Sequence, residues 1–140
     1  MSKTLVPVDG SEASCRAAAW AQKNAAATGS SVTLVHVFDM NAAETISMAN
    51  KTREEIADRI AAHAAPSFDK AKAALSGDDG VETLAVVGNP AEEIIGIALK
   101  QNFDHIVIGS RGLTPIKEIL LGSVSEKVLN RAHCAVTVVR

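Results

Sequence analysis

The residues of this chain that could do chemistry are concentrated in a glycine-rich segment, GSRGLTPIKEILLGSVSEK, at residues 109–127. Glycines stand at positions 109, 112 and 122, and Ser123 follows directly before a helix-like stretch. Glycine has no side chain, so a ligand can approach its backbone N–H closely. The first four amides of a helix lack partners within the helix, and the helix dipole adds about half a positive charge there. The segment therefore predicts a cradle for an anion such as a phosphate chain.

The spacing of these glycines leaves a second interpretation open. Glycines beside strands often mark turns only, and Ser123 with Glu126 three residues later could form a capping box that needs no ligand. The segment has no glycine followed by Lys and Ser or Thr in P-loop spacing, and it has no G-x-G-x-x-G. The common ATPase and dinucleotide-binding schemes are therefore disfavoured.

A second candidate residue, Asp9, lies close to the start of the chain. Proline cannot donate to a strand ladder, so Pro7 predicts that the apolar strand over Leu5–Val8 is ending. Asp9 would then lie at the carboxyl edge of the sheet, where ligands bind in open α/β folds. The strand over Ile106–Ile108 would deliver Gly109 to the same edge. Asp9 could also be only a turn residue or an acid at a helix start.

Apolar runs of strand length alternate along the chain with longer segments of helical periodicity. The short runs are mostly apolar at consecutive positions, which is typical of strands covered on both faces. Such alternation implies right-handed crossovers and a mostly parallel sheet, so we expect an α/β fold with a five-stranded, doubly wound parallel sheet and helices on both faces. The expected strands are Leu5–Val8, Val32–Phe38, Leu84–Val87, Ile106–Ile108 and Ala135–Val139, and the expected helices span 11–27, 52–75 and 123–132, with one more beginning at Pro90.

Three local features add detail to this outline. Pro66 should kink or divide the helix over 52–75, because proline interrupts the helical hydrogen bonds. Residues 39–50 carry no clear pattern and could form a mobile loop. Trp20, on an alanine-rich helix, is expected in the core because an indole is costly to leave in water.

The composition indicates one globular domain over residues 1–140, long enough to bury about two thirds of its unfolded surface. A formal net charge of -2 offers no basic surface for nucleic acid. No apolar run approaches the ~18 residues of a membrane span, and the first residues lead into a strand without a signal-like apolar region. The two cysteines and four histidines show no metal-ligand spacing. We therefore expect reduced thiols, no metal site built from side chains alone, and a cytoplasmic location.

Several motifs together resemble the universal stress protein family. They are LVPVDGSEAS at 5–14, LVHV at 34–37, GNPAEEI at 88–94, IVIGSRGL at 106–113, LLGSVSEKVL at 120–129 and VTVV at 136–139. The resemblance covers nearly the whole chain. Its most specific part is G-x-x-G, nine residues, then G-S, which matches Gly109, Gly112, Gly122 and Ser123 and marks the ATP-binding branch of that family. The resemblance implies a Rossmann-like sandwich of the adenine nucleotide alpha hydrolase-like type.

The same resemblance implies a site for ATP, or for ADP or AMP, with Mg²⁺ held through the phosphates. No catalytic residue follows from it. The residues that it implies around the adenosine are Pro7, Val8, Asp9, Val37, Ile108 and Gly109, with backbone groups of Val37 at the adenine edge. Those that it implies around the phosphates are Gly112, Gly122, Ser123 and Val124, with Ser125 and Arg111 close by.

The leading functional hypothesis is a nucleotide-dependent regulator in the stress response, because no general base is placed by sequence at the carboxyl edge. A slow ATPase or autophosphorylating protein is one alternative, with Ser123 or Ser125 accepting phosphate and Arg111 steadying its charge. A dimeric interaction module that holds no nucleotide is another. As in family members, we expect a homodimer through the last strand, Ala135–Val139, and a client protein is a further possible partner.

Overall fold

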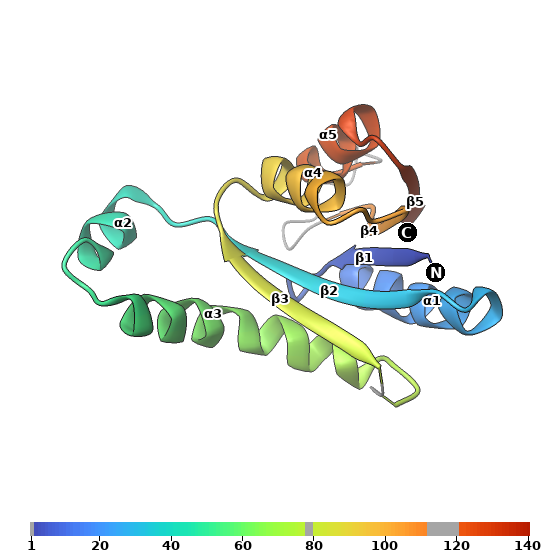
Figure 1. Cartoon of the computed structure of the whole chain (residues 1–140), viewed down its shortest axis with the longest axis horizontal. Helices are drawn as coiled ribbons and strands as arrows, with labels where there is room; N and C mark the ends of the chain where they lie inside the picture. Colours follow the sequence, from blue (N-terminus) through green and yellow to red (C-terminus); the bar gives the residue numbers. More distant parts are fainter. Residues whose placement is uncertain (1, 78–79, 112–120) are drawn as a thin grey trace.

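The computed structural model describes residues 2–77, 80–111 and 121–140, which form a five-stranded sheet with helices on both faces (Figure 1). All strand pairs in it are parallel, in the order β3-β2-β1-β4-β5. The predicted fold class is confirmed. In chain order the elements are β1 (Lys3–Pro7), α1 (Glu12–Thr28), β2 (Ser31–Phe38), α2 (Ala42–Met48), α3 (Arg53–Ala73), β3 (Val81–Val87), α4 (Pro90–Lys100), β4 (His105–Gly109), α5 (Ser123–Arg131) and β5 (Ala135–Val139).

The two faces of the sheet are covered by different pairs of helices (Figure 1). Helices α1 and α3 pack on one face, and α4 and α5 lie on the other. Successive residues of a strand point to opposite faces, so Leu5 belongs to the core under α4 and α5 while Val6 belongs to the core under α1 and α3. Helix α1 turns Ala17, Ala18 and Ala21 toward the sheet, and these small side chains let the helix backbone come close.

Helix α1 packs closely on the sheet at Gly109, the last residue of β4. A Cβ placed on Gly109 would lie 2.8 Å from the carbonyl carbon of Ala13 and 2.9 Å from the amide nitrogen of Ser14. A side chain cannot fit there without displacing the helix. Packing alone therefore explains this glycine, whatever binds nearby.

The sheet opens between β1 and β4. Strand β1 pairs with β2 along its whole length but with β4 only at Thr4 and Leu5. The amide of Val8 donates to the carbonyl oxygen of Val35 in β2, at 2.8 Å. Since successive amides of a strand point to opposite sides, the nitrogen of Pro7 faces β4, where the ladder has already ended. The strand order reverses at this gap, so it is the topological switch point of the fold.

Two alternatives expected for the helices were wrong. Pro66 does not divide its helix, because α3 runs through it as one helix of 21 residues with the proline on its exposed side. Residues 42–48 form helix α2 rather than a loop, and the side chain of Asn41 caps it by accepting a hydrogen bond from the amide of Glu44, at 2.8 Å. No residue of α2 is buried, which is why the sequence carried no apolar repeat there.

Trp20 is not in the core, contrary to the expectation. Its side chain is 39% exposed and lies edge-on to the ring of His105, with ring centroids 6.0 Å apart. The alanines of α1 occupy the side of the helix that faces the sheet, so the indole covers the flank of β4 instead. None of the helices in the described ranges is long and apolar enough to cross a bilayer.

Candidate ligand-binding site

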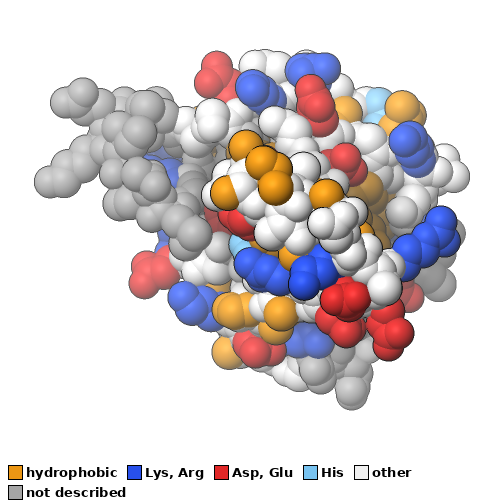
Figure 2. All heavy atoms as spheres, turned by 90° about the vertical axis from the view of Figure 1, so that its left-hand side faces the viewer, with side chains coloured by type: hydrophobic (Ala, Val, Ile, Leu, Met, Phe, Trp, Pro, Cys, Tyr) orange, Lys and Arg blue, Asp and Glu red, His pale blue; other side chains and the backbone are white. Residues whose placement is uncertain are grey.

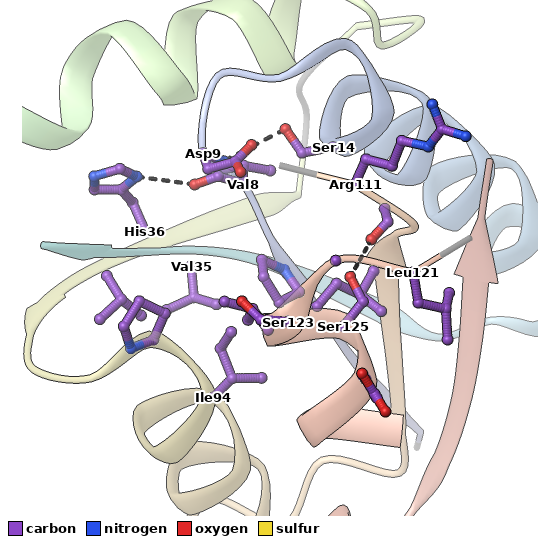
Figure 3. A pocket seen from close by; sticks show the side chains of 18 residues that line it. Val8, Asp9, Ser14, Val35, His36, Ile94, Arg111, Leu121, Ser123 and Ser125 are labelled. Atoms are coloured by element: carbon purple, nitrogen blue, oxygen red, sulfur yellow. Dashed lines mark hydrogen bonds between the residues drawn. The ribbon is translucent and has the colours of Figure 1, made fainter. Parts of the chain in front are cut away.

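A cavity of about 480 Å³ lies at the switch point, where β1 and β4 end (Figure 3). The ends of β1, β2 and β4 and the first turns of α4 and α5 form its walls. Eleven of the twelve predicted site residues line this cavity: Pro7, Val8, Asp9, Val37, Ile108, Gly109, Arg111, Gly122, Ser123, Val124 and Ser125. The twelfth, Gly112, lies outside the described residues. That these residues bind a nucleotide stays a prediction.

Sequence reasoning missed several apolar residues of the cavity wall. Val35 follows from the strand pattern, because it shares a face of β2 with Val37. Pro90 and Ile94 are four residues apart at the start of α4, so they lie on one side of that helix. The remaining lining residues that were not predicted are Ser14, His36, Leu121 and Glu126.

Asp9 is held in a turn at the mouth of the cavity (Figure 3). Its Oδ1 accepts a hydrogen bond from the amide of Ser11, at 2.9 Å, and its own amide lies 3.4 Å from Oγ of Ser14. Ser11 in turn caps α1, because its Oγ accepts from the amide of Ser14 at 3.2 Å. The turn role of Asp9 is therefore real. Within the described residues, Oδ2 of the same carboxylate has no hydrogen-bond partner.

The start of α5 contributes the opposite wall of the cavity. The N-cap residue is Gly122, no side chain caps the helix, and Ser123 is its first residue. The expected capping box from Ser123 to Glu126 is therefore absent, because Gly122 and not Ser123 is the N-cap. Among the residues that the structure describes, no side chain accepts from the first amides of α5. Two bonds of 2.6 Å fix this turn to the end of β4: the amide of Gly122 donates to the Ser110 carbonyl, and Oγ of buried Ser125 donates to the Gly109 carbonyl.

The charged side chains that the structure describes around the cavity do not form a cationic patch. Arg111 is exposed, and its guanidinium points away from Ser123 and Ser125 (Figure 3). Asp9 and Glu126 add carboxylates to the wall. Figure 2 looks onto this end of the molecule and shows acidic and basic side chains interspersed. Among the described groups, positive potential for an anion comes mainly from the amides and the dipole of α5.

Burial changes the pKa of one histidine and one cysteine near the site. His36 lines the cavity, and its Nδ1 lies 2.9 Å from the carbonyl oxygen of Val8. Burial lowers the pKa of His63, which contacts His36, and raises the pKa of the Cys15 thiol on α1. In the part of the chain that the structure describes, no three His, Cys, Asp or Glu side chains are grouped to hold a metal ion.

Comparisons with known proteins agree with this architecture. The model of the universal stress protein family matches residues 1–140. A universal stress protein of Thermus aquaticus is 37% identical over 145 residues, with 100% of both proteins covered. UspA of Lactobacillus plantarum superposes with a TM-score of 0.78 at 27% identity, covering 99% of this chain and 97% of that chain. A universal stress protein solved in complex with cAMP gives 0.73 at 26% identity, with coverage of 99% and 97%. With the family model matched from end to end and a relative of equal extent, this chain belongs to the universal stress protein family.

Proposed function

We propose that this protein binds ATP in the cavity at the switch point and acts as a nucleotide-dependent regulator in the stress response. The observation that carries the proposal is the start of α5, which no side chain caps within the described residues and which lines the same cavity as Asp9. An uncapped helix start with a glycine N-cap suits a phosphate chain. A related universal stress protein was solved with cAMP, which shares the adenosine and phosphate groups of ATP.

The other half of the cavity suits a purine. Its wall is apolar at Val35, Val37 and Ile94, and its volume of about 480 Å³ is that of a small-molecule site. A planar base would lie against these side chains, and the exposed edge of β2 at Val37 would offer backbone groups to it. The second oxygen of the Asp9 carboxylate would accept a hydrogen bond from a ribose hydroxyl.

The phosphates would lie at the amides of Ser123 and Val124. Asp9 and Glu126 bring two carboxylates to the wall, so a bare triphosphate would meet repulsion as well as attraction. Mg²⁺ bound through the phosphates would offset that repulsion. We therefore expect ATP to bind more tightly with Mg²⁺ than without it.

The proposal is tested by adding bulk to Gly122. Its φ of -69° and ψ of 162° are open to any residue, so Gly122→Leu adds a bulky side chain at the cavity wall without straining the backbone. We expect isothermal titration calorimetry with MgATP to show at least a tenfold loss of affinity, about 1.4 kcal/mol, with unchanged circular dichroism. Gly96→Leu is the matched control, because a Cβ on Gly96 meets nothing within 4 Å. Equal affinity for wild type and Gly122→Leu would refute the assignment.

Two further measurements separate this function from its alternatives. Freshly purified protein, once denatured, should release a purine whose ultraviolet absorbance exceeds that of one tryptophan and no tyrosine. Steady-state phosphate release above that of Gly122→Leu would indicate an ATPase or autophosphorylation. For phosphate transfer, Ser123 is exposed, whereas the Ser125 hydroxyl already donates to the Gly109 carbonyl.

A homodimer through β5 is the second part of the proposal. Strand β5 is one edge of the sheet. The Val139 carbonyl accepts from the Ser110 amide at 2.7 Å, so the backbone groups of Val138 point to the free edge. Val138→Pro removes an outward N–H that a partner strand would use, whereas Val138→Ala keeps it. We expect sedimentation velocity to show a dimer for wild type and Val138→Ala and a monomer for Val138→Pro, and a micromolar wild-type monomer would contradict the dimer.

A further inference from the structure

A pair of histidines, one from β2 and one from α3, connects the cavity wall to the helix layer. His36 is only 5% exposed, and its Nδ1 lies 2.9 Å from the Val8 carbonyl oxygen (Figure 3). Its other ring nitrogen, Nε2, lies 2.8 Å from Nδ1 of His63. Val8 is directly followed by Asp9, so this chain of bonds reaches the turn that holds the carboxylate at the cavity mouth.

The Val8 carbonyl fixes where the hydrogens of both rings lie. A carbonyl oxygen can only accept, so Nδ1 of His36 must carry a hydrogen. In a neutral ring Nε2 then carries none and accepts, which requires a hydrogen on Nδ1 of His63. The chain runs in one direction, from His63 to His36 to Val8. Without His63, the buried Nε2 would lose its donor, and the ring of His36 could adopt the other tautomer.

His63 is held in place by its own packing. Its ring stacks on Phe38 with centroids 3.6 Å apart and an interplanar angle of 4°, and the guanidinium carbon of Arg59 lies 5.1 Å from the same Phe38 ring. Burial is the main cause that lowers the pKa of His63, followed by His36 and Arg59, while Glu44 acts in the opposite direction. The neutral form of His63, which donates to His36, is therefore favoured near neutral pH.

We propose that His36 is a positioning residue of the nucleotide site: it fixes the Val8 carbonyl and with it Asp9, and His63 fixes the tautomer in which His36 does so. This role rests on the proposed nucleotide binding. A proton added to Nε2 of His63 leaves both bonds in place, because Nδ1 of His63 still donates to His36 and Nδ1 of His36 still donates to Val8. A second proton sets N–H against N–H and separates the rings.

Charged groups around the two histidines influence how readily the pair takes up this second proton. Arg59 on α3 opposes it and Glu44 on α2 favours it, Asp9 follows the Val8 carbonyl, and the neighbour of His36 on β3 is the uncharged Ala85. Once a second proton has separated the rings, His36 no longer holds the Val8 carbonyl firmly. We expect this to loosen the turn at Asp9 and to weaken nucleotide binding at acid pH.

The test uses two substitutions of His63 in the full chain. His63→Phe keeps a ring to stack on Phe38 but cannot donate to His36, whereas His63→Asn keeps a donor close to the position of Nδ1. Calorimetry with MgATP, from about pH 8 to about pH 5.5, spans the ordinary histidine range. We expect His63→Phe to lower affinity about three- to tenfold at neutral pH and to lose the wild-type fall in affinity at acid pH, with His63→Asn close to wild type. The protonation of ATP itself is common to all variants and cancels in their ratios.

Ring-nitrogen chemical shifts of ligand-free protein provide a readout that does not depend on ATP. His36 should carry its hydrogen on Nδ1 in wild type and in His63→Asn, and should lose this fixed tautomer in His63→Phe. His105→Gln, which alters a histidine away from the cavity, should change neither readout. Wild-type affinity and pH profile in His63→Phe, or a hydrogen on Nε2 of wild-type His36, would overturn the inference alone. Wild type that binds no MgATP would overturn the proposed function, and the positioning role with it.

Discussion

Asp9 has two roles that single substitutions can separate. One carboxylate oxygen closes the turn to the Ser11 amide, and the other lies at the cavity mouth without a partner in the described residues. Asparagine keeps Oδ1 but has an NH2 group, a donor, in place of Oδ2, so it preserves the turn and removes both the charge and the acceptor for a ribose.

Asp9→Asn should therefore leave stability nearly unchanged and weaken ATP binding. We expect a loss of about five- to twentyfold, since a hydrogen bond to a charged group contributes about 1.5 kcal/mol or more. Asp9→Ala, which also opens the turn, should in addition lower the melting temperature. Calorimetry with ATP and thermal melts of both variants measure the two effects, and equal losses of stability would show that the turn does not depend on Oδ1.

Single residues were predictable where their role is local in sequence. Pro7 and Asp9 lie at a recognisable strand end, and Gly122 and Ser123 lie at a helix start. His36 was missed as a site residue because its contacts are with Val8 and with His63, which is 27 residues away, and no short spacing signals such a pair.

Among the contacts between helices and strands, the close packing of α1 on β4 matters most for positioning the site. The alanine face of α1 brings its backbone to within contact of Gly109, so the first turn of the helix lies at the cavity.

Gly109→Ala should destabilise the protein by about 1–3 kcal/mol, because the new methyl group meets the backbone of Ala13 and Ser14. Gly96→Ala, where the added Cβ meets nothing, should stabilise it by about 0.5–1 kcal/mol. Urea unfolding of the two variants measures the difference. A neutral Gly109→Ala would mean that α1 can move away from β4 at little cost.

Pro66 provides a second prediction for the elements. It lies inside α3 on the exposed side, so it withholds one helical hydrogen bond without filling the core. Pro66→Ala should raise the free energy of unfolding by about 1–3 kcal/mol in urea titrations. A loss of stability would mean that the proline ring makes contacts that offset the missing bond.

Strands buried on both faces were predictable from the sequence, whereas exposed strand ends, an exposed helix and helix caps were less so. The predicted strand over Leu84–Val87 was too short because β3 begins at Val81, and its exposed residues Glu82 and Thr83 lack the apolar pattern. Helix α2 was missed because it has no buried face. The start of α5 at Ser123 was predicted correctly, but its N-cap was not, because Ser123 is a better N-cap by residue type than Gly122.

At the scale of the whole molecule, two histidines link stability to pH. Burial lowers the pKa of both His63 and His105 in the folded protein. The unfolded chain therefore takes up protons first as the pH falls, and bound protons then favour unfolding.

The free energy of unfolding should thus fall as the pH drops below about 6.5, the ordinary histidine pKa, and should be insensitive to these groups above it. His105→Gln, which keeps a donor near Oγ1 of Thr137 but cannot titrate, should make this fall shallower. Urea unfolding between about pH 7.5 and about pH 5.5 measures the slope for both proteins. A stability that rises toward acid pH would contradict the assignment.

The short ladder between β1 and β4 divides the sheet into two parts, β3-β2-β1 and β4-β5, which pair with each other at Thr4 and Leu5. A ligand bound across the gap between β1 and β4 would contact both parts of the sheet and hold them together. We therefore expect ligand binding to slow hydrogen exchange in β1 and β4 and to raise the force needed to separate these strands. The protein could then signal that its site is occupied by becoming stiffer, without any change of shape.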